Sequence, residues 1–139
     1  MDIESLTKAL DNDSNEFLLN YNTKKIRDIN KKIIEELSLS KEVSDMYLKK
    51  LKEYKYIDEI SDIRIGGFIK WIPITDPNYL PLNNGGIVCE IKIGDNGLVI
   101  VCKNFMHKYF QVNLDECLCF QKLTHQQLIL LSALDHITK

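Results

Sequence analysis

Four cysteines and three histidines are the residues of this chain best suited to nucleophilic or metal chemistry. A structural zinc site usually contains a Cys-x2-Cys pair, and this sequence has none. Cys117 and Cys119 are one residue apart, so in a strand both sulfurs would share a face, as two small core residues would. A tetrad with Cys89 and Cys102 would require neighbouring strands to align all four sulfurs. We therefore expect no metal ion and no cofactor.

The same residues do not form a pattern typical of an enzyme. A cysteine nucleophile needs a histidine base within hydrogen-bonding reach. Cys102 and His107 flank a predicted loop, but strand alternation turns Cys102 towards the core, where a thiol is unreactive. Neighbouring carboxylates, such as those of Asp115 and Glu116, fit a solvated turn. We predict no catalytic residue and a protein that is not an enzyme.

Composition is that of an ordinary soluble protein. The 139 residues are enough for one domain with a modest core. Charged residues make up 27%, but the formal net charge of −2 gives no basic surplus for nucleic acid. No apolar run approaches the ~20 residues that span a bilayer, and the N-terminal residues lack a secretory pattern. We expect a cytoplasmic protein that is not secreted, does not bind membranes and keeps its cysteines reduced.

Glycine and proline are confined to the middle of the chain, because all six glycines and all three prolines lie between Gly66 and Gly97. These residues interrupt helices and occupy turns, so the segments without them can be helical. The pattern predicts an α+β fold. It combines a helical region over residues 1–60, a small five-stranded antiparallel barrel over 61–122 and a C-terminal helix over 123–139 packed on the same core.

Capping signals and hydrophobic spacing locate the helices. Thr23 can cap one helix with a 3.6-residue apolar period, and Ser40 can cap another whose apolar face reaches Tyr54. The two stretches could form one long helix, but polar residues interrupt a continuous apolar seam, so we expect a helical hairpin. Thr124 and Gln127 form a capping box at the start of the C-terminal helix. Three spaced residues indicate a further short helix: Ile3, Leu6 and Leu10.

Five strands are expected, over residues 63–74, 86–93, 98–103, 109–114 and 117–122. The alternation of GGIVCEIKI assigns four residues to the core face of the second strand: Ile87, Cys89, Ile91 and Ile93. The following GDNG is a hairpin turn. A two-residue Asn96-Gly97 loop would pair Ile93 with Ile100, and a four-residue loop would pair Ile93 with Leu98. Both registers leave Ile100 and Cys102 on the core face.

Two glycine pairs, Gly66-Gly67 and Gly85-Gly86, could in principle cradle a phosphate. A phosphate-binding loop lies between a strand and a helix, and neither pair is followed by a helical segment. Both pairs instead stand at the start of predicted strands, where a missing Cβ permits a bend or a close approach of another backbone. We predict that the pairs bend strands.

Aromatic side chains in predicted loops are better candidates for a functional site. Small barrels often bind ligands through aromatic residues that rim one end. The relevant segments are the strand IKWI, the proline-rich loop PITDPNYLPL and the loop KNFMHKYF. We predict a ligand- or partner-binding site made of Lys70, Trp71, Tyr79, Phe105, Met106 and Tyr109.

The succession IRIGGFIKWI, NNGGIVCEIKI and YFQVNLDECLCFQK resembles small proteins of large cytoplasmic DNA viruses. In those proteins a strand that opens with Gly-Gly-aromatic-Ile-Lys is followed by a second Gly-Gly strand. A closing strand then carries an aromatic residue, Val and Asn. The resemblance covers residues 63–122 and has no catalytic residue. It implies an SH3- or Tudor-like barrel in a virion or infected-cell protein, and hence a location in the virion or host cytoplasm.

Without a reactive arrangement, the candidate contact aromatics favour a non-enzymatic interaction or structural module. Its partner would be another protein or a second copy of the chain. The alternative is a small barrel that binds nucleic acid by base stacking and phosphate contacts. The residues available for that role are Lys70, Trp71, Lys103, Phe105, Lys108 and Tyr109.

Overall fold

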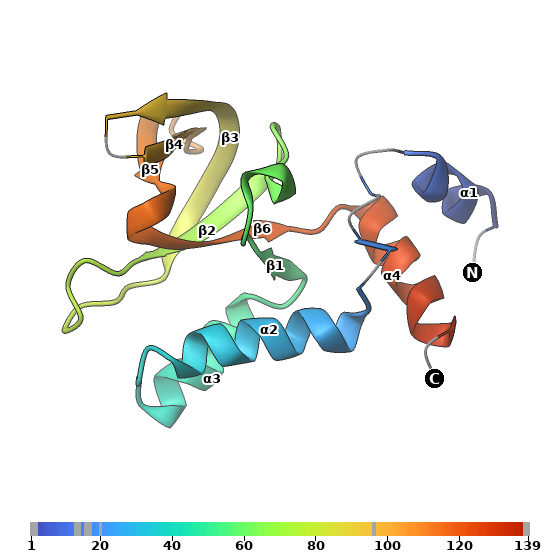
Figure 1. Ribbon diagram of the computed structural model, residues 1–139, viewed down its shortest axis with the longest axis horizontal. Helices are drawn as coiled ribbons and strands as arrows, with labels where there is room; N and C mark the ends of the chain where they lie inside the picture. The colour runs from blue at the N-terminus through green and yellow to red at the C-terminus, as the bar shows by residue number, and fades with distance from the viewer. Residues whose placement is uncertain (1–2, 13–14, 16–17, 20, 96, 138–139) are drawn as a thin grey trace. The chain divides into compact units, whose positions relative to one another are not determined.

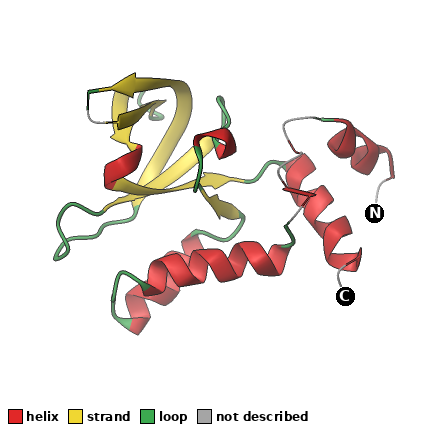
Figure 2. Cartoon of the chain, in the orientation of Figure 1, coloured by secondary structure: helices red, strands yellow, loops and turns green. Residues whose placement is uncertain are grey.

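The structure is a computed structural model that describes residues 3–12, 15, 18–19, 21–95 and 97–137. It has an α+β fold, as predicted, and divides into two compact units (Figures 1 and 2). The helical unit comprises residues 1–55 and 123–139, and the β unit comprises residues 56–122. The C-terminal segment therefore belongs with the N-terminal helices.

Four α-helices are described in the helical unit: α1 (Ile3–Asp11), α2 (Thr23–Glu35), α3 (Lys41–Lys50) and α4 (His125–Ile137). Helix α2 packs against α3 and α4, and α4 also packs against α1. The two stretches with predicted caps at Thr23 and Ser40 thus form two helices, as expected (Figure 1). One apolar cluster joins α1, α2 and α4, and its buried members are Ala9, Leu18, Ile26, Leu123, Leu130 and Leu131.

The helix starts confirm two predicted caps and correct a third. The Ser40 hydroxyl accepts the Val43 N–H at 3.3 Å. The capping box is also present, since the Thr124 N–H donates to Gln127 Oε1 at 2.9 Å and the Gln127 N–H donates to Thr124 Oγ1 at 3.1 Å. These reciprocal bonds satisfy two helix-end donors.

Helix α2 is capped by Asn22, not by Thr23 as predicted, because the Asn22 side chain accepts the Lys25 N–H at 2.8 Å. Thr23 has a different role. Its N–H and its hydroxyl donate to the two carboxylate oxygens of Asp135 in α4, at 2.8 and 2.6 Å. A carboxylate at the first turn of α2 favours the helix because it lies at the positive end of the helix dipole.

Helix α3 ends at Lys50, earlier than predicted, and Tyr54 lies in a strand rather than on the helix face. A turn over residues 51–53 separates the two elements, and Glu53 has a left-handed φ of 69°. Asn30 of α2 compensates for the lost helical bonds, since its buried amide donates to the Tyr54 carbonyl at 2.9 Å. Helical period alone did not reveal this break.

The sheet has six strands and is antiparallel and open, in the order β1-β6-β2-β3-β4-β5. The strands are β1 (Tyr54–Tyr56), β2 (Phe68–Pro73), β3 (Asn83–Gly94), β4 (Gly97–Lys103), β5 (Tyr109–Asn113) and β6 (Cys117–Lys122). The predicted count of five is therefore wrong, because β1 was assigned to a helix. The predicted closure into a barrel is not present, since β1 and β5 are the two edges of the sheet.

The sheet is nevertheless curled. Trp71 of β2 stacks on Phe110 of β5, with ring centroids 5.0 Å apart, although two strands separate β2 from β5 in the sheet order. Both rings pack against the core of the β unit, whose buried members are Ile57, Ile69, Val88, Ile100, Cys102, Val112 and Cys119. The concave face of the sheet thus contains its core.

Strand β3 does not keep one face to the core along its length. Ile91 packs against the core as predicted, and Ile93, near the end of the strand, is exposed. Val88 is buried, whereas Ile87 and Cys89 are exposed, so the predicted core face is wrong for these two residues. The cause is an irregular register between Val88 and Glu90, where β3 has one residue more than β4. An extra residue turns the following side chains to the opposite face.

The β3–β4 hairpin has the second of the two predicted registers, in which Ile93 pairs with Leu98 and Ile91 with Ile100. Asn96 lies outside the described residues. That register would also have paired Cys89 with Cys102, but the bulge places Val88 opposite Cys102 instead. A disulfide between these cysteines is absent, and all four thiols are free.

Both glycine pairs lie where the backbone turns or approaches another strand closely, as predicted. Gly66 lies in a turn before β2 with a φ of 87°, and its N–H donates to the Val88 carbonyl at 2.8 Å. Gly85 has a φ of 59° and lies within β3, where the register with β2 shifts. There the backbone of β3 comes so close to Ile69 that a Cβ could not be accommodated.

Candidate contact surface

The structure separates the six predicted site residues into two groups. Tyr79, Phe105, Met106 and Tyr109 are between 67% and 79% exposed, which is unusual for large apolar side chains. Lys70 and Trp71 are only partly exposed and belong to β2. Trp71 is held by Phe110 and the core, so it contributes to the curl of the sheet rather than to a surface site.

The loop between β4 and β5 holds two of the exposed residues in a defined conformation. The Asn104 side chain accepts the backbone N–H groups of Met106 and Lys108, at 2.9 and 3.1 Å. The Asn104 N–H donates to the Lys108 carbonyl at 3.0 Å, and His107 has a left-handed φ of 60°. These bonds close the loop on itself, so Phe105 and Met106 project from an ordered turn.

A cross-strand row adjoins this loop on the convex face of the sheet. Ile87 of β3 pairs with Lys103 of β4, and Lys103 pairs with Tyr109 of β5. The neighbours Val88, Cys102 and Phe110 pack into the core, so the row faces away from it. The Lys103 ammonium lies 5.7 Å from the centre of the Tyr109 ring, within cation–π range.

Four exposed residues and the half-buried Lys103 therefore form one surface, which we call the contact surface: Ile87, Lys103, Phe105, Met106 and Tyr109. Ile87 was missed by sequence reasoning because uninterrupted alternation had placed it in the core; only the bulge after Val88 turns it outward. Tyr79 lies in the separate loop between β2 and β3, where its N–H donates to the Asp76 carbonyl. No described contact joins Tyr79 to the contact surface.

The cysteines are placed as structural residues. Cys102 and Cys119 are fully buried, and burial raises the pKa of Cys102 to about 12 and that of Cys119 further still. Burial also raises the pKa of the half-buried Cys117 to about 11. These thiols stay protonated at neutral pH and are poor nucleophiles and ligands. Within the described ranges, no group of three His, Cys, Asp or Glu residues could hold a metal ion.

Cys89 differs from the other three because it is exposed. We expect Cys89 to react with a thiol reagent such as DTNB at pH 7.5 faster than the half-buried Cys117, and much faster than the buried Cys102 and Cys119, which react only as the protein opens. The measurement is the time course of thiol release. Cys89→Ser should remove the fast phase and leave the slow phases unchanged. A fast phase that survives this substitution would show that another thiol is accessible.

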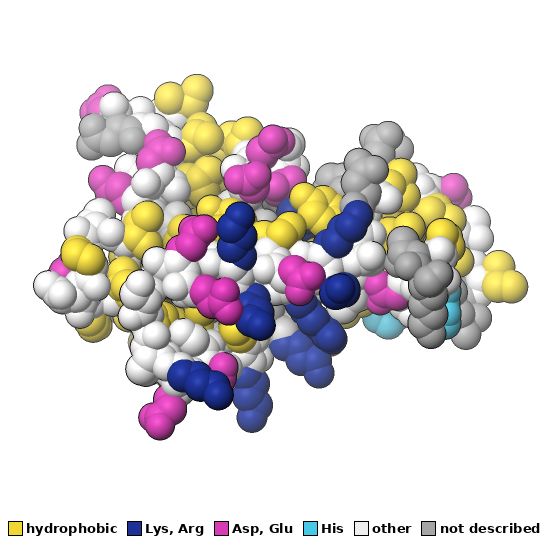
Figure 3. Space-filling view, turned by 60° about the horizontal axis from the view of Figure 1, so that its bottom comes forward, with side chains coloured by type: hydrophobic (Ala, Val, Ile, Leu, Met, Phe, Trp, Pro, Cys, Tyr) yellow, Lys and Arg dark blue, Asp and Glu magenta, His cyan; other side chains and the backbone are white. Residues whose placement is uncertain are grey.

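Charge on the helical unit fits a solvated surface. The stretch KKIRDINKK lies in α2, and its charged residues, all exposed, are Lys24, Lys25, Arg27, Asp28, Lys31 and Lys32. In Figure 3, lysine and arginine side chains are interspersed with carboxylates over the face shown. Such alternation does not form the continuous basic stripe typical of a nucleic-acid interface.

Comparisons with known proteins identify no relative of the chain. No family model, no curated protein and no solved structure matches the chain. In the part of the chain that the structure describes, no helix is long and apolar enough to cross a membrane.

Proposed function

We propose that the protein is a non-enzymatic interaction module that binds a partner protein through the contact surface. The observation that carries this proposal is the cluster of exposed apolar side chains around Lys103 on an ordered loop and sheet face. Aromatic residues and methionine are enriched at protein interfaces, where their burial supplies most of the binding energy. A preformed loop also loses little entropy on binding.

The charge of the surface supports an acidic partner. Residues 103–110 contain Lys103, His107 and Lys108 and no acid. A symmetric dimer through this surface would bring lysines towards lysines, which disfavours a second copy of the chain as the occupant. We therefore propose an extended segment of another protein that carries alternating apolar and acidic side chains.

Nucleic acid is the alternative occupant. The cation–π contact between Lys103 and Tyr109 supports this alternative, as does the exposed ring of Phe105. Ile87 and Met106 favour protein instead, because aliphatic side chains make no phosphate contact and stack poorly on bases. The two cations of the 103–109 segment are also few for an interface whose affinity depends on phosphate neutralisation.

The resemblance of residues 63–122 to proteins of large DNA viruses supports a place for this module in a viral particle or an infected cell. The curl that brings Trp71 onto Phe110 supports a relation to SH3-like barrels, in which the edge strands close.

Fluorescence anisotropy with defined probes tests the proposal. The probes are a labelled ten-residue peptide of alternating Glu and Leu, a matched peptide of Lys and Leu, and a single-stranded oligonucleotide. We expect the acidic peptide to bind and the basic one not to bind. Phe105→Ala/Met106→Ala should weaken binding by about tenfold or more, since two interface anchors of this kind contribute over 1 kcal/mol.

Ile93→Ala provides the matched control, because Ile93 is 85% exposed and lies at the far end of β3, outside the contact surface. It should leave peptide binding unchanged. Oligonucleotide binding that falls steeply with salt, together with no peptide binding, would replace the proposal with the nucleic-acid alternative. Equal losses for Ile93→Ala and the double variant would show non-specific adhesion and would also overturn it.

A further inference from the structure

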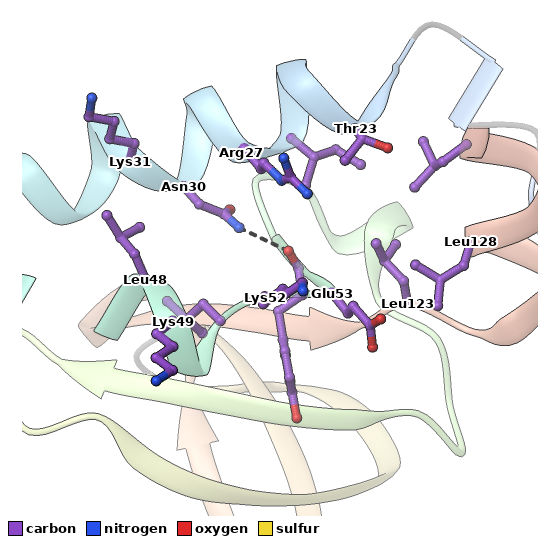
Figure 4. Close-up of a pocket in the computed structure, with 14 residues that line it drawn as sticks. Thr23, Arg27, Asn30, Lys31, Leu48, Lys49, Lys52, Glu53, Leu123 and Leu128 are labelled. Carbon is purple, nitrogen blue, oxygen red and sulfur yellow. Dashed lines mark hydrogen bonds between the residues drawn. The ribbon is translucent and has the colours of Figure 1, made fainter. Parts of the chain in front are cut away.

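A pocket of about 500 Å³ lies within the helical unit, bounded by α2, α3, the segment after α3 and the start of α4 (Figure 4). Leu48 lies towards one end of the pocket and Leu128 towards the other. A volume of this size is within the roughly 300–1,000 Å³ of small-molecule sites. Its aliphatic lining residues are Ile26, Leu48, Leu51, Leu123, Leu128 and Leu131.

The lining of this pocket is strongly basic. Four basic residues contribute to it, against the single acid Glu53: Arg27, Lys31, Lys49 and Lys52. Lys31 is 4.0 Å from the Glu35 carboxylate, but Arg27, Lys49 and Lys52 have no acidic partner among the described residues. Arg27 extends from α2 towards the segment of Lys52 and Glu53 (Figure 4). Cations without counter-charges beside an apolar recess favour a ligand that is both apolar and anionic.

We infer that this pocket binds an amphipathic organic anion with a single aliphatic chain, such as a free medium-chain carboxylate. The chain would lie against the leucines, and the carboxylate would accept hydrogen bonds from Arg27 and Lys52. Guanidinium–carboxylate pairs combine charge with directional bonding, which fixes the orientation of the head group. This site is independent of the contact surface, because every residue that lines it belongs to the helical unit.

The size of the pocket favours a single chain over an amphipathic helix of a partner. Two turns of a helix with side chains occupy roughly 800 Å³, from a diameter of about 10 Å and a length near 11 Å. The pocket is smaller than that, whereas an aliphatic chain of ten carbons fits within it.

Isothermal titration calorimetry with decanoate, below its micelle-forming concentration at pH 7.5, tests the inference. We expect saturable binding to one site per chain. Arg27→Gln/Lys52→Gln should weaken decanoate binding by about tenfold or more, as expected for the loss of two charge-assisted hydrogen bonds. Both positions are exposed, so the substitutions should leave the helical circular dichroism signal unchanged.

Lys24→Gln/Lys32→Gln removes the same amount of charge at two positions of α2 that do not line the pocket, and should change the affinity by no more than about twofold. Decyltrimethylammonium, which has the same chain and the opposite charge, should not bind. The inference is wrong if the wild-type chain does not bind decanoate, if the cationic analogue binds equally well, or if both double variants bind decanoate with equal affinity. Binding of an acidic helical peptide without decanoate binding would assign the pocket to a partner protein instead.

Discussion

Replacement of Gly85 by alanine is expected to lower the free energy of unfolding by about 3 kcal/mol, through a strained φ and a steric overlap. The backbone φ of 59° lies in the left-handed region, which disfavours a residue with a Cβ. The new methyl group would also overlap the Ile69 carbonyl oxygen on β2. Backbone cannot rotate away as a side chain can, so the β2–β3 pairing must distort. Urea unfolding, followed by the fluorescence of the single tryptophan, Trp71, measures the loss.

Gly66→Ala is the matched control for this prediction. Gly66 has a φ of 87°, but a Cβ there would meet no atom within 4 Å. The substitution should therefore cost only the conformational part of the effect, about 1 kcal/mol. Equal losses for the two variants would show that the close approach of β3 to Ile69 is not needed for the fold.

The helices could be predicted from the sequence because their signals are local. A capping box depends on two residues three positions apart, and both hydrogen bonds between Thr124 and Gln127 are present. The predicted cap at Thr23 was wrong by one residue, because Asn22, Thr23 and their neighbours offer several possible caps. The choice among them depends on Asp135, which is distant in sequence and accepts a hydrogen bond from Thr23. The predicted end of α3 was wrong for a similar reason, since the Tyr54 carbonyl accepts a hydrogen bond from Asn30 of another helix.

The sheet was predicted less well because its geometry depends on partner strands. Alternation in β3 indicates two faces, but it contains no sign of the extra residue between Val88 and Glu90 that exchanges those faces. This exchange of faces also changes which residues lie at the contact surface. Ile87 is a surface residue, and Val88 in place of Cys89 pairs with Cys102.

The loop aromatics illustrate what composition can and cannot indicate about the candidate site. Phe105, Met106 and Tyr109 follow a predicted strand in a segment rich in polar residues, and the structure places all three at the surface. Trp71 has a similar sequence context beside Lys70, yet it stacks on Phe110. That contact exists only because the sheet curls, which is a property of the assembled strands.

High pH is expected to destabilise the β unit strongly through its two buried thiols. Burial raises the pKa of Cys102 from its ordinary 9.0 to about 12, and it raises that of Cys119 further. In the unfolded chain both thiols ionise near pH 9, whereas in the folded chain both stay protonated. Above pH 9 the unfolded state therefore binds fewer protons, so stability is fully present below that pH and falls as pH rises. Above pH 9 each thiol lowers the free energy of unfolding by about 1.4 kcal/mol per pH unit. The two thiols together should therefore remove about 4 kcal/mol between pH 7 and pH 10.5, nearly all of it above pH 9.

Lysines and tyrosines also titrate in this range, so the test requires the difference between two proteins. Cys102→Ala/Cys119→Ala lacks both buried thiols and retains every other titrating group. Its stability at pH 7 should be lower, because each substitution leaves a small cavity. Its further loss up to pH 10.5 should be about 4 kcal/mol smaller than that of the wild-type protein, measured by urea unfolding with a reductant present. If the two stability curves run parallel, the thiols are not buried in the folded protein, and the concave face of the sheet does not contain the core described here.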